Sequence, residues 1–509
     1  MKILDNSTAS IRRGAVVIPA WIGLALIGGV MAAIWYFTFG GRYPLSRYGD
    51  LPQQSLATLN GNSLDSAILY SLATAGLFLL YWLGARWIKE AGRAGWLVLI
   101  GGALAMNAAL LPMHTMDAAD IYDYIIRGRM TAFYNLNPMQ DTPERVPAGD
   151  NILPFAAWKD ATSAYGPAWE TIAALTVRIA GPDRDTNVVV FKLLSCLGYA
   201  LTAALIAWAL RALAPERAML GAYLFAWNPL MVYFAGGTGH NDMLMVAAMA
   251  LSVGCLLRRW YVPAAAAAVV GALIKFIPLL LIPIIAIKIW HDLPWRGRIV
   301  TYAALAVTGA ALVLIFYAPY WVGFDSLALD RRGRMFTSSA GTLVRQALRP
   351  LVGDDSAISL VSRGATALFG LYALWELWRL FRAKTLENQM WIAAALRIVL
   401  FYLLLGAIWF QHWYLVWIIP FAAMLPDTPA RRLTLWWSYI VTFQPLIYNY
   451  VSMRYTGWMD EPWRDLVPIV VFMGGAWLFV IGYWVWRASG RNRSIFKGAR
   501  LVPKAEGSS

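Results

Sequence analysis

Three carboxylates stand close together directly after a long apolar segment. Asp117, Asp120 and Asp123 follow the uncharged run 94–113. Acidic side chains beside membrane-compatible segments are rare, and where they occur they tend to serve function. A carboxylate held at a membrane surface can accept a proton from a hydroxyl group. These three acids are therefore the leading candidates for chemistry.

The spacing of the acids favours different roles. In a helix covering 117–129 along the outer membrane face, Asp117 occupies the N-cap position, and Asp120 three residues later completes a capping box. Asp123 lies four residues before Arg127, which is the spacing of an exposed helical ion pair worth about 0.3–0.5 kcal/mol. Asp120 shares a face with Tyr124 and has no equally good cationic partner in this helix. It either completes the cap or acts as a base.

A second polar segment, Ser163 to Glu170, predicts a turn followed by a helix. Pro167 suits the first helical position, and a simple join between loop and helix accounts for Gly166 as well. We expect Tyr165 and Trp169 to face the outer surface, where aromatic side chains are common.

A third segment, 236–242, is rich in glycine and opens a predicted span on the outer side. Asn241 or Asp242 could be an ordinary N-cap. His240 is a titratable side chain beside flexible glycines, so it could contact a substrate.

Composition defines the broad class of protein. The 509-residue chain is 60% hydrophobic and 14% charged, and its mean hydropathy is +0.55. Uncharged runs such as 14–41 exceed the roughly 20 apolar residues that cross a bilayer as a helix. The sequence predicts an all-α polytopic membrane protein. We expect about 13 or 14 transmembrane helices, at 14–39, 67–88, 94–113, 187–211, 217–235, 240–257, 261–275, 276–290, 299–320, 363–383, 390–410, 412–425, 433–451 and 467–487.

Basic residues gather in alternate loops, which by the positive-inside rule face the cytoplasm together with both termini. The formal net charge of +15 therefore reflects topology and contact with anionic membrane lipid. It does not indicate nucleic-acid binding, because the basic residues are dispersed among the spans. We expect residues 1–487 to form one membrane-embedded unit and 488–509 to form a basic cytoplasmic tail. The cytoplasmic basic residues include Lys2, Arg12, Arg13, Arg86, Lys89, Arg93, Arg211, Arg217, Arg258, Arg259, Lys288, Arg296, Arg298, Arg379, Arg382, Lys384, Arg431 and Arg432.

The same alternation places the long loops 114–186 and 321–362 outside, where they would form the active-site side. Arginine suits phosphate groups, and loop 321–362 contains Arg331, Arg332, Arg334, Arg345 and Arg349. Simple solvation accounts equally well for about half of these arginines, since Asp330 stands beside two of them. Lys275, in an apolar outer turn, is a second phosphate candidate.

Several motifs, taken in order, resemble a known family. They are Asp120-Ile121-Tyr122-Asp123-Tyr124, Gly128-Arg129, Asn137-Pro138, Tyr165-Gly166-Pro167, Asn228-Pro229-Leu230, Gly239-His240-Asn241-Asp242, Lys275-Phe276-Ile277-Pro278 and Trp413-Tyr414. The ordered set is similar to that of the bacterial polyprenol-phosphomannose-dependent α-1,6-mannosyltransferases, which are GT-C glycosyltransferases.

This resemblance implies that a sugar, mannose, moves from a polyprenyl-phosphate donor to a glycan or glycolipid acceptor on the outer face of the cell membrane. It implies that Asp120 is the general base. We assign no metal ligand and no cofactor. Tryptophans at 158, 169, 321 and 413 could stack on sugar rings or anchor the chain at the interface. The expected substrate-binding residues are Tyr124, Tyr165, Glu170, His240, Asn241, Asp242, Lys275, Arg334, His412, Trp413 and Tyr414.

Two other classes of protein remain open from the sequence. A transporter or flippase of lipid-linked sugars would share many spans, but it usually shows pairs of broken helices in two related halves, which this sequence does not. A metal-dependent enzyme would need His114, His240 or His412 to join Asp120, and no pair of histidines has the spacing of ligands on one helix.

Overall fold

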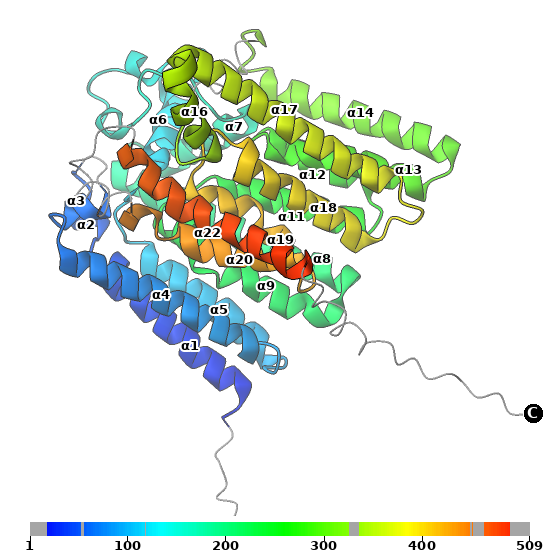
Figure 1. The fold of residues 1–509 in the computed structure, drawn as a ribbon. Helices are drawn as coiled ribbons and strands as arrows, with labels where there is room; N and C mark the ends of the chain where they lie inside the picture. Colours follow the sequence, from blue (N-terminus) through cyan, green and yellow to red (C-terminus); the bar gives the residue numbers. More distant parts are fainter. Residues whose placement is uncertain are drawn as a thin grey trace, which may run out of the picture.

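The structure is a computed structural model that describes residues 18–51, 55–117, 119–324, 335–447, 450 and 463–488. The regular elements in these ranges are helices, which run roughly side by side through the molecule (Figure 1). Extended segments pair there only as two isolated bridges, Pro44 with Met113 and Thr337 with Trp409. The prediction of an all-α fold is confirmed.

The helices follow one another along the chain in a simple order. The N-terminal part contains α1 (Ala20–Trp35), η1 (Tyr36–Gly40), α2 (Leu45–Tyr48), α3 (Leu56–Leu59), α4 (Leu64–Trp87), α5 (Ala94–Leu110), α6 (Asp120–Phe133), α7 (Pro167–Ala180), α8 (Arg184–Leu213), α9 (Ala218–Ala226), α10 (Pro229–Val232), η5 (Tyr233–Gly237), α11 (Asp242–Leu257) and α12 (Tyr261–Ala272). The C-terminal part contains α13 (Leu281–Asp292), α14 (Trp295–Tyr317), α16 (Ala340–Val352), α17 (Asp354–Phe381), α18 (Asn388–Phe401), η8 (Tyr402–Gly406), η9 (His412–Trp417), α19 (Ile419–Met424), α20 (Pro429–Val441) and α22 (Trp463–Ala488).

A helix lies in each of the predicted ranges. Among the described residues, seven helices are long and apolar enough to cross a membrane, fewer than the 13 or 14 expected from the sequence: Ala20–Gly40, Leu64–Trp87, Arg184–Leu213, Trp295–Tyr317, Asp354–Phe381, Asn388–Gly406 and Ile469–Trp486. The pair Pro215–Ala226 and Pro229–Gly237 would add an eighth span, bent by 57°. Helices α5, α11 and α12 and the segment His412–Met424 are apolar but shorter. The chain is therefore a polytopic membrane protein.

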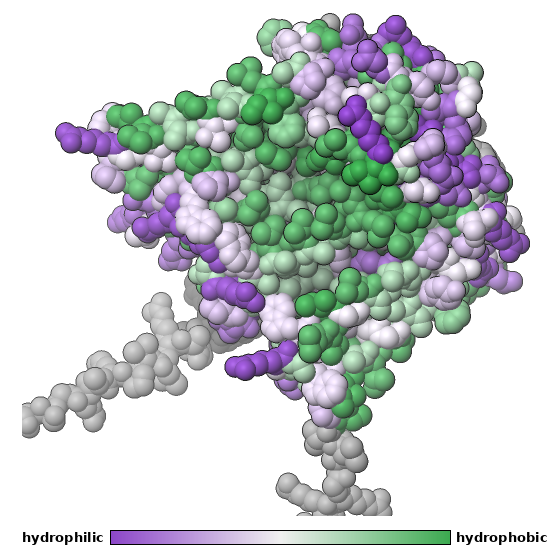
Figure 2. All heavy atoms as spheres, turned by 180° about the vertical axis from the view of Figure 1, so that it is seen from behind, coloured by the Kyte–Doolittle hydropathy of each residue, from purple (hydrophilic) through white to green (hydrophobic). Residues whose placement is uncertain are grey.

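Apolar side chains cover much of the outer surface of the helix bundle. Figure 2 shows a broad hydrophobic area across one face, with hydrophilic residues gathered toward its edges. Helix α14 has no buried residue, and the side chains of Val307, Leu314 and Ile315 are 67–70% exposed. A helix that satisfies its own backbone hydrogen bonds can present such side chains to hydrocarbon. Lipid is the solvent that fits this surface.

The connecting loops divide between two ends of the bundle. The loops joining α4 to α5, α8 to α9, α13 to α14 and α17 to α18 lie at the right-hand end in Figure 1, whereas α2, α3, α6 and α16 lie at the left-hand end. The first group contains the basic loops that the sequence places in the cytoplasm. The arrangement is thus consistent with one basic end and one end that carries the acidic motif.

We predict that the end carrying α6 faces outside, because the basic loops favour the cytoplasm. Ala148→Cys and Glu90→Cys place thiols on exposed loops at the two ends. A membrane-impermeant thiol reagent applied to intact cells should label the first variant and not the second. If only the Glu90→Cys variant were labelled, the end carrying α6 would face the cytoplasm instead.

Candidate active site

Helix α6 begins at Asp120, later than the capping-box interpretation required. The residue at the N-cap is Ala119, and no side chain caps the helix there. Asp117 adopts a left-handed φ of +63°, and its carboxylate accepts hydrogen bonds from Leu56 N (3.1 Å) and Tyr233 OH (3.2 Å). The predicted cap was wrong because the Asp117 carboxylate turns away to link two other segments. Asp120 is thereby left without a capping partner.

The Asp120 carboxylate faces two polar groups that come from distant segments. Its Oδ2 lies 3.7 Å from Nε2 of His240, and it accepts a hydrogen bond from the Tyr165 hydroxyl at 3.4 Å. The side chain is 16% exposed. Burial raises the pKa of Asp120 to about 6, although the charge of Lys275 acts in the opposite direction. A carboxyl with this pKa is ionised at neutral pH and more basic than an ordinary aspartate.

A close backbone contact positions Tyr165. Gly166 N donates to Ile274 O, and Ala168 N donates to Leu273 O, both at 3.0 Å. A Cβ on Gly166 would come within 2.1 Å of Leu273 O, so only glycine allows α7 to dock here. The loop-to-helix join predicted at Pro167 is present, and its docking places Tyr165 against the turn after α12.

His240 is held by the turn that precedes α11. The His240 Nδ1 atom lies 2.9 Å from the hydroxyl of Thr238, and Gly239 adopts a φ of +69° that favours glycine. The ring packs between Phe234 and Trp413, with centroid separations of 4.9 and 4.8 Å. These contacts direct Nε2, which has no hydrogen-bond partner among the described residues, toward Asp120.

Asp242 is fully buried and forms an ion pair with Lys275, whose side chain is 16% exposed. Lys275 Nζ lies 2.7 and 2.8 Å from the two carboxylate oxygens, and Trp417 Nε1 donates to Oδ1 at 2.6 Å. Neither Asn241 nor Asp242 caps α11 through its side chain. Lys275 Nζ also lies 5.4 Å from the ring centroid of Tyr165. The lysine thus connects the docked turn to the start of α11.

Aromatic side chains pack behind Asp120. The hydroxyl of Tyr124 donates to Asn241 Oδ1 at 3.1 Å, and its ring contacts those of Tyr165 and Trp169 at centroid distances of 5.2 and 4.8 Å. Trp169 is 2% exposed. The expectation that Trp169 faces the outer surface was wrong, because α6 and Phe191 of α8 cover it.

The ion pair of Asp123 and Arg127 is present, with a separation of 3.1 Å. The prediction that it is exposed was wrong, since the two side chains are 2% and 4% exposed. Arg127 also donates to the carbonyls of Trp158 and Ala161, and Trp158 N donates to Asp123 Oδ1. The loop between α6 and α7 covers this face of α6, so the pair holds that loop in place.

Glu170 lies on the first turn of α7 and is fully buried. It accepts a hydrogen bond from Ser163 Oγ at 2.5 Å. Burial raises the pKa of Glu170 to about 7. Its second carboxylate oxygen has no partner among the described residues, and no contact joins Glu170 to Asp120.

The C-terminal half contributes a group of aromatic side chains that pack beside His240 and Lys275. His412 packs against Phe234 and Trp413 at centroid distances of 5.0 and 5.1 Å. Tyr414 stacks on Trp417 at 4.1 Å. His412, Trp413, Tyr414 and Trp417 come from η9, whereas Phe234 lies in η5, so the site combines both halves of the chain.

Of the five predicted phosphate-binding arginines, the structure describes Arg345 and Arg349. Arg334, with Arg331 and Arg332, lies outside the described residues. Arg345 makes a bidentate ion pair with Asp354, at 2.8 and 2.9 Å, and its guanidinium is therefore already engaged.

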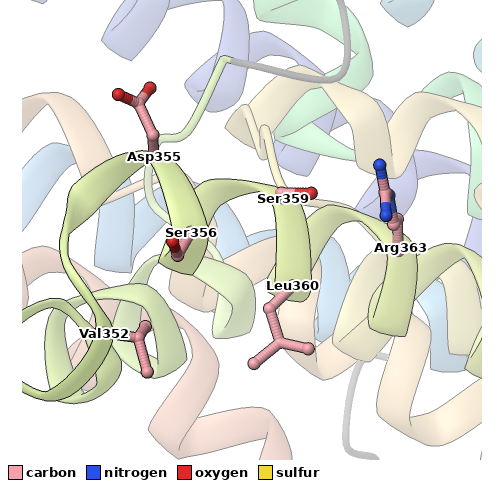
Figure 3. Close-up of a pocket in the computed structure, with 6 residues that line it drawn as sticks. All are labelled: Val352, Asp355, Ser356, Ser359, Leu360 and Arg363. Atoms are coloured by element: carbon pink, nitrogen blue, oxygen red, sulfur yellow. The ribbon is translucent and has the colours of Figure 1, made fainter.

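Two open hollows lie away from this cluster. One, of about 500 Å³, lies along the start of α17, where Asp355 and Arg363 point to one side of the helix and Leu360 to the other, with Val352 contributed by the end of α16 (Figure 3). A second, of about 480 Å³, is lined by Arg259, Lys288, Asp292 and Glu387 among others. Neither hollow is lined by Asp120 or the residues around it. Among the described residues, no group of three or more His, Cys, Asp or Glu could hold a metal ion.

Some residues that build the site were not identified from the sequence. Trp417 binds Asp242, Thr238 orients His240, and Ser163 binds Glu170. Thr238 and Ser163 stand inside motifs that the sequence already singled out. Trp417 gave no such signal, because only the fold brings η9 to α11.

The bundle is all-α and polytopic, as in the GT-C glycosyltransferases that the sequence motifs resemble, and it gathers a carboxylate, a histidine and a lysine–aspartate pair at one end. A family model described as "Alpha-(1->6)-mannopyranosyltransferase, N-terminal domain" matches residues 21–291, which is more than half of the chain. The protein therefore belongs to the alpha-(1->6)-mannopyranosyltransferase family.

Two curated relatives carry the same name. The chain is 27% identical over 270 residues to alpha-(1->6)-mannopyranosyltransferase A of Mycobacterium tuberculosis, covering 52% of this chain and 50% of that protein. It is 23% identical over 184 residues to alpha-(1->6)-mannopyranosyltransferase A of Corynebacterium glutamicum, covering 36% of each. The match thus spans half or less of these relatives.

We predict that Asp123→Asn destabilises the protein by about 3 kcal/mol, because it leaves Arg127 buried without its counter-charge. Thermal unfolding in detergent should show a lower melting temperature. Asp427→Asn is a matched control, since Asp427 and its partner Arg432 are 58% and 66% exposed; its effect should stay below about 0.5 kcal/mol. Equal effects of the two substitutions would contradict the structural role of the buried pair.

Proposed function

We propose that the protein is a membrane glycosyltransferase that moves mannose from a polyprenyl-phosphate donor to a glycan or glycolipid acceptor. The observation that carries this proposal is the placement of Asp120 opposite His240 and Tyr165, at the end of the bundle away from the basic loops. The relatives' names supply the sugar.

In this proposal Asp120 is the general base. A polyprenyl phosphate is already a good leaving group, so the protein must position the reactants and deprotonate the acceptor hydroxyl. Asp120 is partly exposed and has a raised pKa, which suits a base. Glu170 and Asp242 are the next candidates, but Glu170 is fully buried and Asp242 is neutralised by Lys275.

The donor phosphate would approach Lys275, whose side chain is 16% exposed. Its ammonium lies among the rings of Tyr165, Tyr414 and Trp417. Aromatic rings beside a cation suit both a sugar and its phosphate. Because Asp242 already neutralises the positive charge of Lys275, we propose that Arg334 supplies a further cation for the phosphate.

The remaining polar and aromatic residues would hold the two sugars. Trp413 covers His240, and the Asn241 side-chain nitrogen has no partner among the described residues. Unpaired buried donors of this kind need a partner, and sugar hydroxyls are suitable. The proposed substrate-binding residues are Tyr124, Tyr165, Glu170, His240, Asn241, Asp242, Lys275, Arg334, His412, Trp413 and Tyr414.

The acceptor would be used on the outer face of the cell membrane. This assignment follows from the basic loops at the opposite end of the bundle. Both termini would then be cytoplasmic, residues 1–487 would form one catalytic unit, and 488–509 would form a basic tail.

We predict that Asp120→Asn lowers turnover by at least about 100-fold, because it preserves shape and removes the proton acceptor. The assay uses purified protein in detergent with polyprenyl-phosphate mannose and an acceptor glycan, without an ion gradient. Asp65→Asn, on an exposed helix start, is the control and should retain normal turnover.

Near-normal turnover of Asp120→Asn would assign the base elsewhere. Movement of the lipid-linked sugar across vesicles, with no glycosidic product under adequate donor and acceptor, would instead identify a transporter.

We predict that kcat/KM rises with pH and levels off above a midpoint near 6. A general base works in its ionised form, and burial places the pKa of Asp120 at about 6. Activity should therefore fall about tenfold per pH unit below that midpoint. Rates measured from pH 4.5 to 8.5 test this. A midpoint near 7 would point to Glu170, and a midpoint near 4 to an exposed carboxylate.

A further inference from the structure

Helix α8 carries a lysine within an otherwise apolar stretch. Lys192 is fully buried. Its ammonium donates to the carbonyl oxygen of Leu111 at 3.4 Å and to that of Met113, and it forms no ion pair with any residue that the structure describes. A charged side chain inside a spanning helix is costly and tends to be retained for function.

The aliphatic stem of Lys192 lies beneath the turn that carries His240. A Cβ added to Gly239 would meet Lys192 Cγ at 3.2 Å and Ile121 Cδ1 at 2.9 Å. Ser195, one turn further along α8, donates from Oγ to His240 O at 2.9 Å. Helix α8 thus packs against the backbone of the turn that carries His240, through Lys192 and Ser195.

The ammonium of Lys192 holds the corner between α5 and the acidic motif. Backbone hydrogen bonds from Leu45 N to Pro112 O and from His114 N to Tyr43 O, both 2.7 Å, join the same corner to Tyr43 and the first residue of α2. Lys192 joins this corner to α8 and also lies against the glycine turn, which Met113 and Ile121 approach as well.

We propose that Lys192 is a positioning residue that sets the separation between Asp120 and His240. It holds the corner leading to α6 with its ammonium and supports the turn before α11 with its stem. The inference rests on the proposed role of Asp120 as the base. Lys192 itself is buried beneath the turn and does not touch the reacting atoms.

The test compares Lys192→Met with the wild-type protein. Methionine keeps an apolar stem and removes the two hydrogen bonds, so the corner should separate from α8. We expect kcat to fall about 100-fold, as for a catalytic group displaced by about 1 Å. The KM for the donor should change less than about threefold, since no substrate contact is lost. Backbone amides of 111–124 should exchange hydrogen faster.

Two further variants separate positioning from stability. Lys192→Gln retains a donor for one carbonyl, so its kcat should lie between those of the wild type and the methionine variant; it decides the question if Lys192→Met fails to fold. Lys288→Met removes another buried lysine, whose ion pair with Asp292 lies in α13. It should lower the melting temperature without changing kcat or exchange at 111–124.

The possible outcomes are distinct. A folded Lys192→Met or Lys192→Gln protein with wild-type kcat and wild-type exchange overturns the inference. Loss of kcat in Lys288→Met equal to that in the Lys192 variants also overturns it, since the effect would then be general instability. If Asp120→Asn stayed active while Lys192→Met showed faster hydrogen exchange at 111–124, Asp120 would not be the base. The contact of Lys192 with the corner before α6 would still be confirmed.

Discussion

The ion pair between the buried Asp242 and Lys275 is the contact on which the candidate site depends. Because burial of either charge alone is costly, the start of α11 and the turn after α12 must stay together. Tyr165 reaches the same lysine through the docking of Gly166 on that turn. Trp417 joins from the C-terminal half. One paired charge thus holds segments from four parts of the chain around the Asp120 carboxylate.

The pattern of apolar residues was enough to predict that the chain is helical and lies in a membrane, because roughly 20 uncharged residues in a row cross a bilayer as an α-helix. The glycine-containing motifs also marked segments that meet at one end. Sequence spacing could not show whether a helix face is covered. The spacing of Asp123 and Arg127 predicted their ion pair, but its burial depends on the loop that packs over α6.

The same limit explains Asp117 and Trp169. A cap is a local feature, yet Asp117 binds Leu56 and Tyr233, which lie far from it in the chain. Trp169 has the spacing of an interface residue, but Phe191 of α8 packs against it. In each case a contact between distant segments overrides the local pattern, and only the assembled bundle reveals which side chains are interior.

Helix α14 lies between the surrounding lipid and the segments that form the candidate site. Arg296 and Arg298 occupy its first turn, so its apolar part, 299–317, extends about 28 Å, close to the hydrocarbon thickness of about 30 Å, and none of its side chains is fully buried by protein. A change in bilayer thickness would therefore be met by this helix as a change of tilt. Tyr320, just beyond its end, accepts hydrogen bonds from Asn137 and Thr171, and Thr171 lies one residue after Glu170 on α7. A change in the acyl-chain length of the surrounding lipid would thus reach α7, which begins two residues after Tyr165.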